Sequence, residues 1–259
     1  MDILWLEFLF IFIIGSAIGS FLNVVIYRIP LNKSIVFPNS YCPKCNRSIR
    51  PYENIPVISF IFLRGKCAGC KEKISLQYPI VEAIMGLLAM LMLYSYNWSW
   101  DLLIFGAMVA VLLALSVIDI ATYRLPNKII ITGVIIAVVL TVLLKREYVL
   151  NMILGGLTGL FLLSLMGLIS KLLLRKDTLG MGDIKLAGMI GLYLGPFQTA
   201  GMFIIGVFVG ALVGISLIIA RGKKWGQRIP FGPYLAIGGV IALLWGDSLW
   251  QWYISFALP

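Results

Sequence analysis

Two aspartates stand at the ends of long apolar stretches in this sequence. Asp119 follows the stretch 102–118, and Asp183 comes shortly before the stretch 186–220. Because charge is costly in a bilayer, acids at such positions need a specific reason to be there. If the two face each other, they form an aspartic dyad, in which one carboxyl keeps a proton while the other activates water for attack on a peptide carbonyl. The alternative interpretation is that each is a solvated helix cap or pairs with a nearby cation.

The residues around Asp183 leave room for another chain segment to approach its carboxylate. Gly180 and Gly182 carry no side chains, so the backbone can come near another helix or an extended peptide. The uncharged stretch 186–194 is only nine residues long, so we expect this helix to draw Asp183 and Lys185 partly below the membrane surface. Gly180, Gly182 and Lys185 are therefore predicted to support an active site.

Histidine is absent from all 259 residues. This excludes Ser-His and Cys-His triads, HExxH zinc proteases and histidine relays. Proton transfer must fall to carboxylates, lysines, tyrosines or thiols.

The four cysteines form two CxxC pairs, Cys42 with Cys45 and Cys67 with Cys70, separated by 21 residues. This spacing predicts a zinc ribbon, in which four thiolates close a tetrahedral shell around one ion. Such closed sites are structural, so we expect the ion to hold together a small domain that is too short for a well-filled core. Disulfides are the alternative, but a loop in the reducing cytoplasm favours zinc.

The elements that must position these residues are membrane helices. Hydrophobic residues make up 61% of the chain and charged residues only 12%, against about a quarter charged in soluble domains. Stretches free of Asp, Glu, Lys and Arg occupy 8–27, 83–100, 102–118, 129–144, 148–170, 186–220 and 229–246. The stretch 186–220 is too long for one crossing and contains Gly195-Pro196, so we expect two helices there. The predicted fold is an all-α polytopic membrane protein with about eight transmembrane helices and a small cytoplasmic zinc-ribbon-like domain.

The distribution of positive charge predicts the orientation. Nineteen of the 21 lysines and arginines fall in alternate loops, and only Lys145 and Arg146 fall on the other side. Cytoplasmic loops are rich in Lys and Arg, which places both aspartates at the cytoplasmic edge and both termini outside. The net charge of +10 is thus explained by basic loops at a membrane, and no nucleic-acid partner is expected.

Taken in order, these motifs resemble one family, the bacterial prepilin peptidases, also described as type IV prepilin leader peptidases/N-methyltransferases. The resemblance rests on GSFLNVVIYRIP at 19–30, the two CxxC pairs, YENIP at 52–56, YPIVE at 78–82, Asp119 with LPN at 125–127, GMGDIKL at 180–186 and IPFGPYLA at 229–236. Many relatives have Asp where Asn127 stands and Trp where Tyr52 stands, but neither difference touches the aspartates or the cysteines.

The resemblance implies a GxGD-type membrane aspartic protease whose catalytic residues are Asp119 and Asp183. It implies that the chain cuts the leader from type IV prepilins or pseudopilins at the cytoplasmic face of the bacterial inner membrane. It further implies methylation of the new N-terminal residue with S-adenosylmethionine. The expected parts are a first transmembrane helix (1–27), a cytoplasmic four-cysteine domain associated with methyl transfer (28–77) and a transmembrane aspartic peptidase domain (78–259).

The methyl-donor site is the least defined, because no glycine-rich Rossmann fingerprint follows a strand. Candidate donor contacts are polar groups in the otherwise apolar N-terminal region: Asn23, Arg28, Glu53, Asn54 and Glu82. A carboxylate among them could bond the donor's ribose or amine, or hold the substrate amine. In the competing structural interpretation, Asn23 caps the first helix while Glu53 and Asn54 order the ribbon.

Two further functions stay open at this point. One is a peptidase without methylation, although the full cysteine loop favours the bifunctional type. The other is an ion-coupled transporter that uses Asp119 and Asp183 as a relay. Transporters often carry repeated halves and place their acids near the midplane, and neither feature is found in this sequence. The expected partners are prepilin or pseudopilin substrates and the lipid bilayer, and the sequence indicates no oligomeric state.

Overall fold

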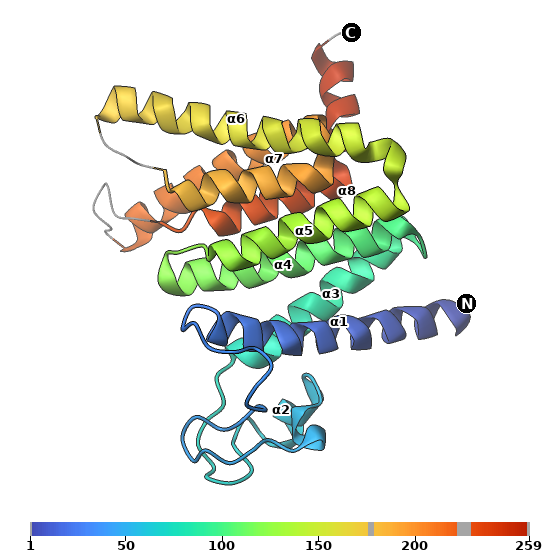
Figure 1. Cartoon of the computed structure of the whole chain (residues 1–259), viewed down its shortest axis with the longest axis vertical. Helices are drawn as coiled ribbons and strands as arrows, with labels where there is room; N and C mark the ends of the chain where they lie inside the picture. Colours follow the sequence, from blue (N-terminus) through green and yellow to red (C-terminus); the bar gives the residue numbers. More distant parts are fainter. Residues whose placement is uncertain (1, 176–178, 222–228, 258–259) are drawn as a thin grey trace. The chain divides into compact units, whose positions relative to one another are not determined.

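The computed structural model describes residues 2–175, 179–221 and 229–257. Within these ranges it contains seven helices long and apolar enough to cross a membrane, and no strand beyond two isolated β-bridges. Figure 1 shows these helices as α1 and α3 to α8. The predicted all-α polytopic fold is therefore confirmed. Four of the cations that entered the predicted orientation lie outside the described residues, namely Lys176, Lys223, Lys224 and Arg228.

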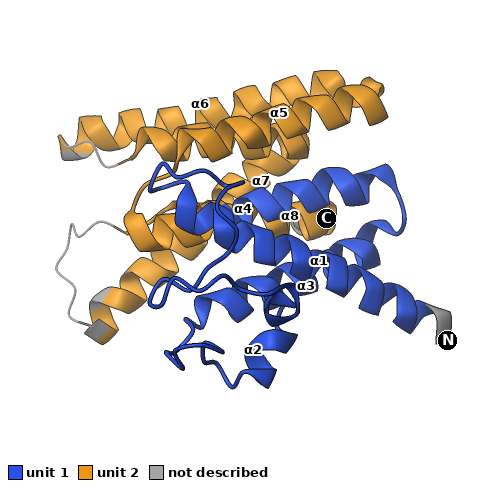
Figure 2. Cartoon of the chain, turned by 60° about the horizontal axis from the view of Figure 1, so that its bottom comes forward, with its two compact units in different colours: residues 1–114 blue, residues 115–259 orange. Residues whose placement is uncertain are grey.

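The chain divides into two compact units, residues 1–114 and 115–259 (Figure 2). The division falls within α4 (Trp100–Thr122). Unit 1 contains the four cysteines, and unit 2 contains both aspartates singled out above.

In unit 1, α1 (Asp2–Arg28) packs antiparallel against α3 (Gln77–Tyr96). Small residues allow the two backbones to approach closely. A Cβ at Gly15 would lie 2.7 Å from the Cβ of Ala89, and a Cβ at Gly19 would lie 2.7 Å from the Cα of Glu82. This contact brings the end of α1 beside the start of α3, where several of the candidate polar residues lie.

The segment between α1 and α3 contains little regular structure. It holds a 3-10 turn, η1 (Pro51–Asn54), and one short helix, α2 (Ile58–Phe62). The remainder consists of loops, drawn at the bottom of Figure 1. A segment with so few helical hydrogen bonds needs another source of order, and the cysteines lie within it.

Unit 2 contains α5 (Asn127–Leu144), the turn η2 (Arg146–Tyr148), α6 (Val149–Leu174), α7 (Met181–Arg221) and α8 (Gly232–Ala257). Glycines again allow close packing. A Cβ at Gly155 in α6 would overlap the carbonyl oxygen of Gly191 in α7, and a Cβ at Gly238 in α8 would lie 2.6 Å from the carbonyl oxygen of Met202. Helix α7 thus packs against helices on two sides by direct backbone contact.

Helix α7 is interrupted at Gly195. Its 41 residues would extend about 60 Å as one helix, roughly twice the hydrocarbon thickness of a bilayer. Gly195 has φ 77° and ψ 172°, a conformation outside the helical region, and Pro196 follows. The sequence predicted a turn at this pair, which is why it predicted eight crossings where the described chain has seven helices.

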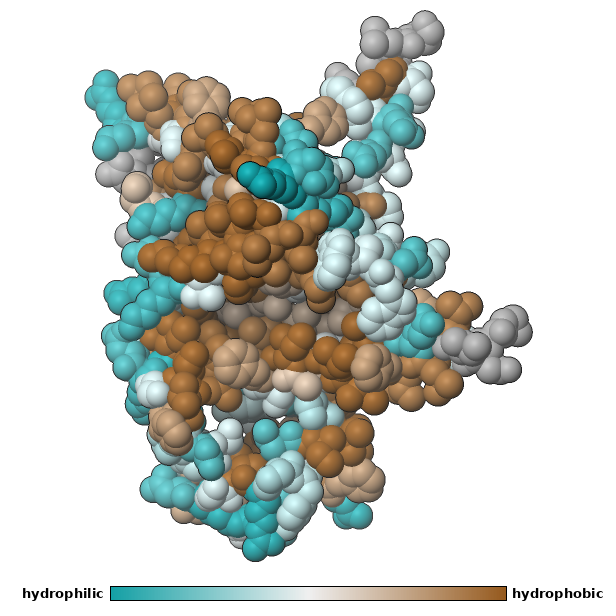
Figure 3. All heavy atoms as spheres, turned by 45° about the vertical axis from the view of Figure 1, so that its right-hand side comes forward, coloured by the Kyte–Doolittle hydropathy of each residue, from teal (hydrophilic) through white to brown (hydrophobic). Residues whose placement is uncertain are grey.

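The outer faces of the helices are apolar. Figure 3 shows a mostly brown surface over the helices and mostly teal and white atoms at the bottom, where the segment between α1 and α3 lies. Large apolar side chains such as Trp5, Leu143 and Leu173 are more than 70% exposed. In water such a surface would be unfavourable, so these faces contact lipid.

Candidate functional site

Asp119 lies in the last turn of α4 and is almost fully buried, with 5% of its surface exposed. Its Oδ2 accepts a hydrogen bond of 3.0 Å from the backbone N–H of Gly232, the first residue of α8. A Cβ at position 232 would lie 2.8 Å from the same oxygen, so glycine leaves the room that this contact needs. The carboxylate therefore sits at the N-terminus of α8, where the helix dipole stabilises negative charge.

Asp183 lies in the first turn of α7 and is half-buried. Its backbone N–H donates to the carbonyl oxygen of Gly180 over 3.1 Å, and its carboxylate accepts a hydrogen bond from the backbone of Gly180. A Cβ at Gly180 would lie 3.1 Å from Oδ2 of Asp183. Asp183 thus closes the first turn of its own helix, and its charge also benefits from a helix N-terminus.

The segments that carry the two aspartates meet at Leu125. A Cβ at Gly182 would lie 3.1 Å from the Cβ of Leu125, and a Cβ at Gly232 would lie 3.3 Å from its Cδ2. The carboxylate of Asp119 is close enough to act electrostatically on Asp183. The structure therefore brings the two predicted catalytic residues into one environment within unit 2, and two like charges at such range favour sharing of a proton.

Lys185 does not pair with either aspartate in the described part of the chain. Its Nζ donates instead to Oδ1 of Asn127 over 3.0 Å, and the side chain is exposed. Asn127 is the first residue of α5. Lys185 thus connects the starts of α7 and α5.

The four cysteines are brought together as predicted. The sulfur atoms of Cys42, Cys45, Cys67 and Cys70 all lie within 4.8 Å of one another, and none is in a disulfide. Cys42 Sγ and Cys70 Sγ are 3.8 Å apart. This matches the sulfur–sulfur edge of a tetrahedron with zinc–sulfur bonds of about 2.3 Å. The four cysteines can therefore bind a metal ion.

Both CxxC pairs have the same backbone pattern. In each, the first cysteine donates its N–H to the carbonyl five residues later and accepts a hydrogen bond from the N–H four residues later. Asn46 and Lys71, which directly follow the second cysteine of each pair, adopt left-handed φ values of 55° and 60°. The sequence shows the two pairs but not this repeat, because lysine does not indicate a left-handed residue.

The surroundings of the thiols shift the pKa values of Cys67 and Cys70 in opposite directions. The backbone N–H groups of Cys70 and Gly69 donate to the sulfur of Cys67 and lower the pKa of its thiol to about 7. The pKa of Cys70 rises to about 11, since burial and the neighbouring thiols outweigh the lowering effect of the Glu72 N–H. Four thiolates at this range repel one another, so full ionisation requires a bound cation.

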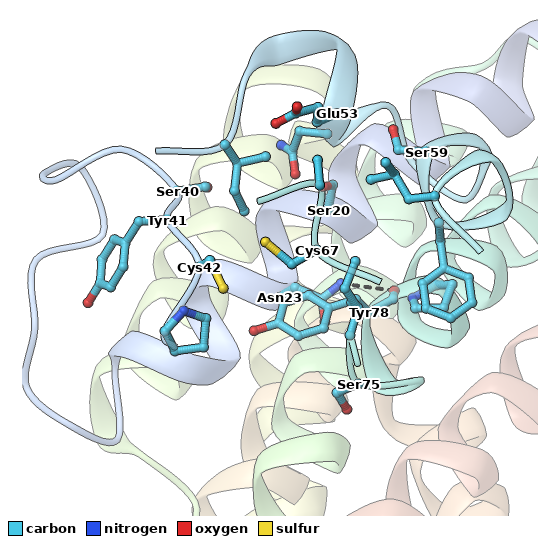
Figure 4. Close-up of a pocket in the computed structure, with 18 of the residues that line it drawn as sticks. Ser20, Asn23, Ser40, Tyr41, Cys42, Glu53, Ser59, Cys67, Ser75 and Tyr78 are labelled. Carbon is cyan, nitrogen blue, oxygen red and sulfur yellow. Dashed lines mark hydrogen bonds between the residues drawn. The ribbon is translucent and has the colours of Figure 1, made fainter. Parts of the chain in front are cut away.

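A cavity of about 360 Å³ lies beside the cysteines, entirely within unit 1. It is lined by all five predicted donor contacts, Asn23, Arg28, Glu53, Asn54 and Glu82. It is also lined by four aromatic rings, those of Tyr27, Tyr41, Phe60 and Tyr78. Cys42 and Cys67 form part of the wall, and Figure 4 shows them next to Asn23.

Two of the five candidates have both ends of their charged group engaged by the protein. The Arg28 guanidinium donates to the carbonyls of Ser34 and Pro38 over 3.0 and 2.7 Å. Glu53 Oε1 pairs with Arg47 over 2.8 Å, and its Oε2 accepts the backbone N–H of Arg50 over 3.1 Å. These two contacts hold the pKa of Glu53 below its ordinary value. Both side chains thus order the loops around the cavity.

Asn23 is engaged on one side only. Its Nδ2 donates to the backbone carbonyl of Tyr78 over 3.1 Å, shown as a dashed line in Figure 4. Because a carbonyl can only accept, this bond fixes the orientation of the amide. Within the described chain the buried Oδ1 has no hydrogen-bond partner.

The role of Val57, which precedes α2, could not be predicted from the sequence. Its N–H donates to Oε2 of Glu82 over 2.7 Å, and its φ of 60° and ψ of −49° are rare for a β-branched residue. Valine itself gives no indication of such a conformation. The only available signal was the YENIP motif at 52–56, directly before it.

Two family descriptions match the chain: the bacterial peptidase A24 N-terminal domain over residues 13–96 and the type IV leader peptidase family over residues 106–215. The chain is also similar over nearly its whole length to proteins named prepilin leader peptidase/N-methyltransferase. One from Aeromonas salmonicida is 34% identical over 279 residues, which cover 98% of this chain and 96% of that protein. Those from Pseudomonas aeruginosa and Neisseria gonorrhoeae are 33% identical, and the alignments cover 95% and 94% of this chain and 92% and 93% of theirs. No solved structure matches the chain.

Proposed function

The chain belongs to the type IV leader peptidase family, and from this premise we propose that it is a bifunctional membrane enzyme, a prepilin leader peptidase and N-methyltransferase. Its substrates are type IV prepilins or pseudopilins. It first removes the leader and then methylates the new N-terminal amine. The similarity supports both activities, because it extends over the cysteine-containing unit as well as the unit with the aspartates.

Asp119 and Asp183 are the proposed catalytic pair of the peptidase. One carboxylate accepts a proton from water as the water attacks the scissile carbonyl, and the other carboxyl donates a proton to the carbonyl oxygen. The observation that supports this most directly is their shared environment, with each carboxylate bonded to backbone N–H at a helix N-terminus. No covalent nucleophile is needed, which agrees with a chain that has no histidine.

The proposed location of cleavage is the cytoplasmic edge of the inner membrane. Both aspartates lie within one turn of a helix end, Asp119 at the end of α4 and Asp183 at the start of α7. The charge distribution supports placing these ends in the cytoplasm, with both termini outside. A prepilin whose apolar segment lies in the membrane would present its leader junction at this depth.

The cavity in unit 1 is the proposed site of S-adenosylmethionine, which supplies an electrophilic methyl group when bound. Its volume of about 360 Å³ is within the range of small-molecule sites. The aromatic rings offer faces for the adenine and for the sulfonium cation. The unpartnered Oδ1 of Asn23 fits a hydrogen-bond donor of a ligand. Asn23 and Asn54 are the proposed donor contacts, while Arg28 and Glu53 shape the cavity.

The proposed ion at the four cysteines is zinc in a structural role. Four sulfur ligands in a closed tetrahedron leave no open position for catalysis. Since Cys42 and Cys67 line the cavity, the ion would hold the wall of the methyl-donor site in place.

The direct test is intact-mass analysis of a purified prepilin incubated with the enzyme, with and without S-adenosylmethionine. Loss of the leader plus one methyl group is the expected result. Loss of the leader alone would contradict methyl transfer and leave a peptidase. No mass change with several prepilins would contradict the peptidase proposal itself and direct attention to ion transport.

A further inference from the structure

Three glutamates, Glu53, Glu72 and Glu82, line the cavity of unit 1. They differ in whether a cation or solvent balances the charge of the carboxylate. Glu53 pairs with Arg47, and Glu72 is exposed to solvent. Glu82 is only 8% exposed and forms no ion pair among the residues that the structure describes. A buried carboxylate without a cation is costly, so a cationic ligand would gain most by binding beside Glu82.

The carboxylate of Glu82 is held in a fixed orientation. Its Oε2 accepts the N–H of Val57, and the hydroxyl of Ser20 also donates to it. The positive φ of Val57 is the kind of backbone strain that persists only where surrounding contacts impose it, as at ligand sites. Gly19 lets α1 touch α3 at the Cα of Glu82. These contacts fix a charged group at the wall of a cavity.

The depth of Glu82 also restricts its ligand. It is the sixth residue of α3, about 7.5 Å along the helix from Gln77 at 1.5 Å per residue. The uncharged stretch of α3 begins at residue 83, so the carboxylate lies directly at the end of the part of this helix that is apolar enough to cross a membrane. The N-terminal amine of a cleaved pilin, at the tip of a membrane-embedded apolar helix, would lie at this level.

We propose that Glu82 binds the α-ammonium group of the cleaved pilin and accepts its proton before methyl transfer. This inference rests on the proposed methyltransferase activity and adds to it the residue that receives the amine. Glu82 is then a catalytic residue of the second reaction and takes no part in cleavage.

Proton transfer to Glu82 precedes methyl transfer in the proposed reaction. The carboxylate takes one proton from R–NH₃⁺, which gives R–NH₂ and a neutral Glu82. The nitrogen then bonds to the methyl carbon of S-adenosylmethionine while the carbon–sulfur bond breaks and sulfur keeps the electron pair. The products are R–NH₂⁺–CH₃ and S-adenosylhomocysteine, and Glu82 returns its proton to water.

The test is the Glu82→Gln variant, which keeps an oxygen that can accept the Val57 N–H and removes only the charge. We expect methylation of a pre-cleaved pilin to fall at least about 100-fold. Prepilin cleavage should be unchanged, which shows that unit 2 is folded. Affinity for S-adenosylhomocysteine, measured by calorimetry, should also be unchanged.

A second readout does not depend on methylation. Wild-type enzyme should bind a cleaved pilin with a free N-terminus about tenfold more tightly than the acetylated form. Glu82→Gln should bind both equally. If the variant kept the preference for the free amine, the assignment would be wrong.

The matched control is Glu72→Gln, which removes the same charge from the wall of the same cavity at an exposed position. It should methylate like wild type, and a loss equal to that of Glu82→Gln would contradict a specific role for Glu82. Loss of S-adenosylhomocysteine binding by Glu82→Gln would instead mean that the donor's own ammonium occupies the site. Absence of methylation by the wild-type enzyme would overturn the methyltransferase proposal itself, which is a distinct outcome.

Discussion

Asp119 and Asp183 each meet the start of a helix, Asp119 that of α8 and Asp183 that of its own α7. Both carboxylates receive backbone N–H groups at these helix ends. A hydrogen bond to a charged group contributes about 1.5–3 kcal/mol, and the helix dipole adds to it. These contacts offset part of the cost of burying negative charge at the two helix ends.

Replacing either aspartate by asparagine should abolish cleavage, because the pair then loses the proton it shares. We expect Asp119→Asn and Asp183→Asn each to lower the rate of prepilin cleavage by at least about 10²- to 10⁴-fold. Methylation of a pre-cleaved pilin should persist in both variants, and an unchanged thermal unfolding profile is the control for the folding of unit 2. A single variant with full cleavage activity would rule out the dyad.

Gly232 should tolerate no side chain, since a Cβ there would press on Asp119 Oδ2 at 2.8 Å and on Leu125 at 3.3 Å. We expect Gly232→Ala to lower cleavage about 10- to 100-fold by displacing the carboxylate. Gly106→Ala in α4 is the matched control, because nothing lies within 4 Å of its Cβ position. Equal activity of the two variants in a cleavage time course would contradict this account of Gly232.

At the scale of elements, the helices could be predicted from the apolar stretches alone. Each predicted span overlaps an observed helix, and the interruption at Gly195 was visible as a Gly-Pro pair. The hydrogen bonds that shape the cavity of unit 1 could not be predicted from the sequence. The contact between Glu82 and Val57 joins residues 25 apart through a strained backbone, and Arg28 binds carbonyls whose positions no side chain indicates. Sequence names the groups at the cavity, but folding decides which of them the protein itself engages.

The cysteine-containing segment should depend on its metal more than the helices do, because it contains only η1 and α2 as regular structure. We expect Cys42→Ser combined with Cys45→Ser to abolish metal binding and to lower methylation about 10- to 100-fold, with a smaller effect on cleavage. Metal content by mass spectrometry and the two rates check this. Lys44→Ala, between the same cysteines, should keep the metal, and an unchanged metal content in the cysteine variant would contradict the site.

At the scale of the whole molecule, the distribution of positive charge agrees with the proposed location of cleavage. The aspartates that would meet a cytoplasmic leader lie at helix ends next to basic loops, and nineteen of 21 cations occur in alternate loops of that kind. This asymmetry orients a polytopic chain during insertion. The two proposed sites belong to different compact units, since the cavity is lined by unit 1 and the aspartates belong to unit 2.

The orientation can be measured with alkaline phosphatase fusions, which are active only outside the cytoplasm. A fusion at the C-terminus should be active, and a fusion in the 171–185 loop should be inactive, because that loop carries four of the cytoplasmic cations. A fusion at Lys145 serves as a second external control and should be active. The reverse pattern would place the aspartates on the wrong side for a cytoplasmic leader.

Two of the four clustered cysteines, Cys42 and Cys67, line the cavity. The proposed methyl transfer would therefore depend on the cell's supply of the metal. If the ion is zinc, as proposed, a bacterium starved of zinc would still insert this enzyme and still cleave its prepilins, since the proposed aspartate pair does not use the metal. The wall of the proposed methyl-donor site would lose its order, and the first residue of each new pilin would carry an unmodified amine. The supply of one trace element would thereby set the chemical form of the pilus subunit, which N-terminal mass analysis of pili from zinc-limited cultures would reveal.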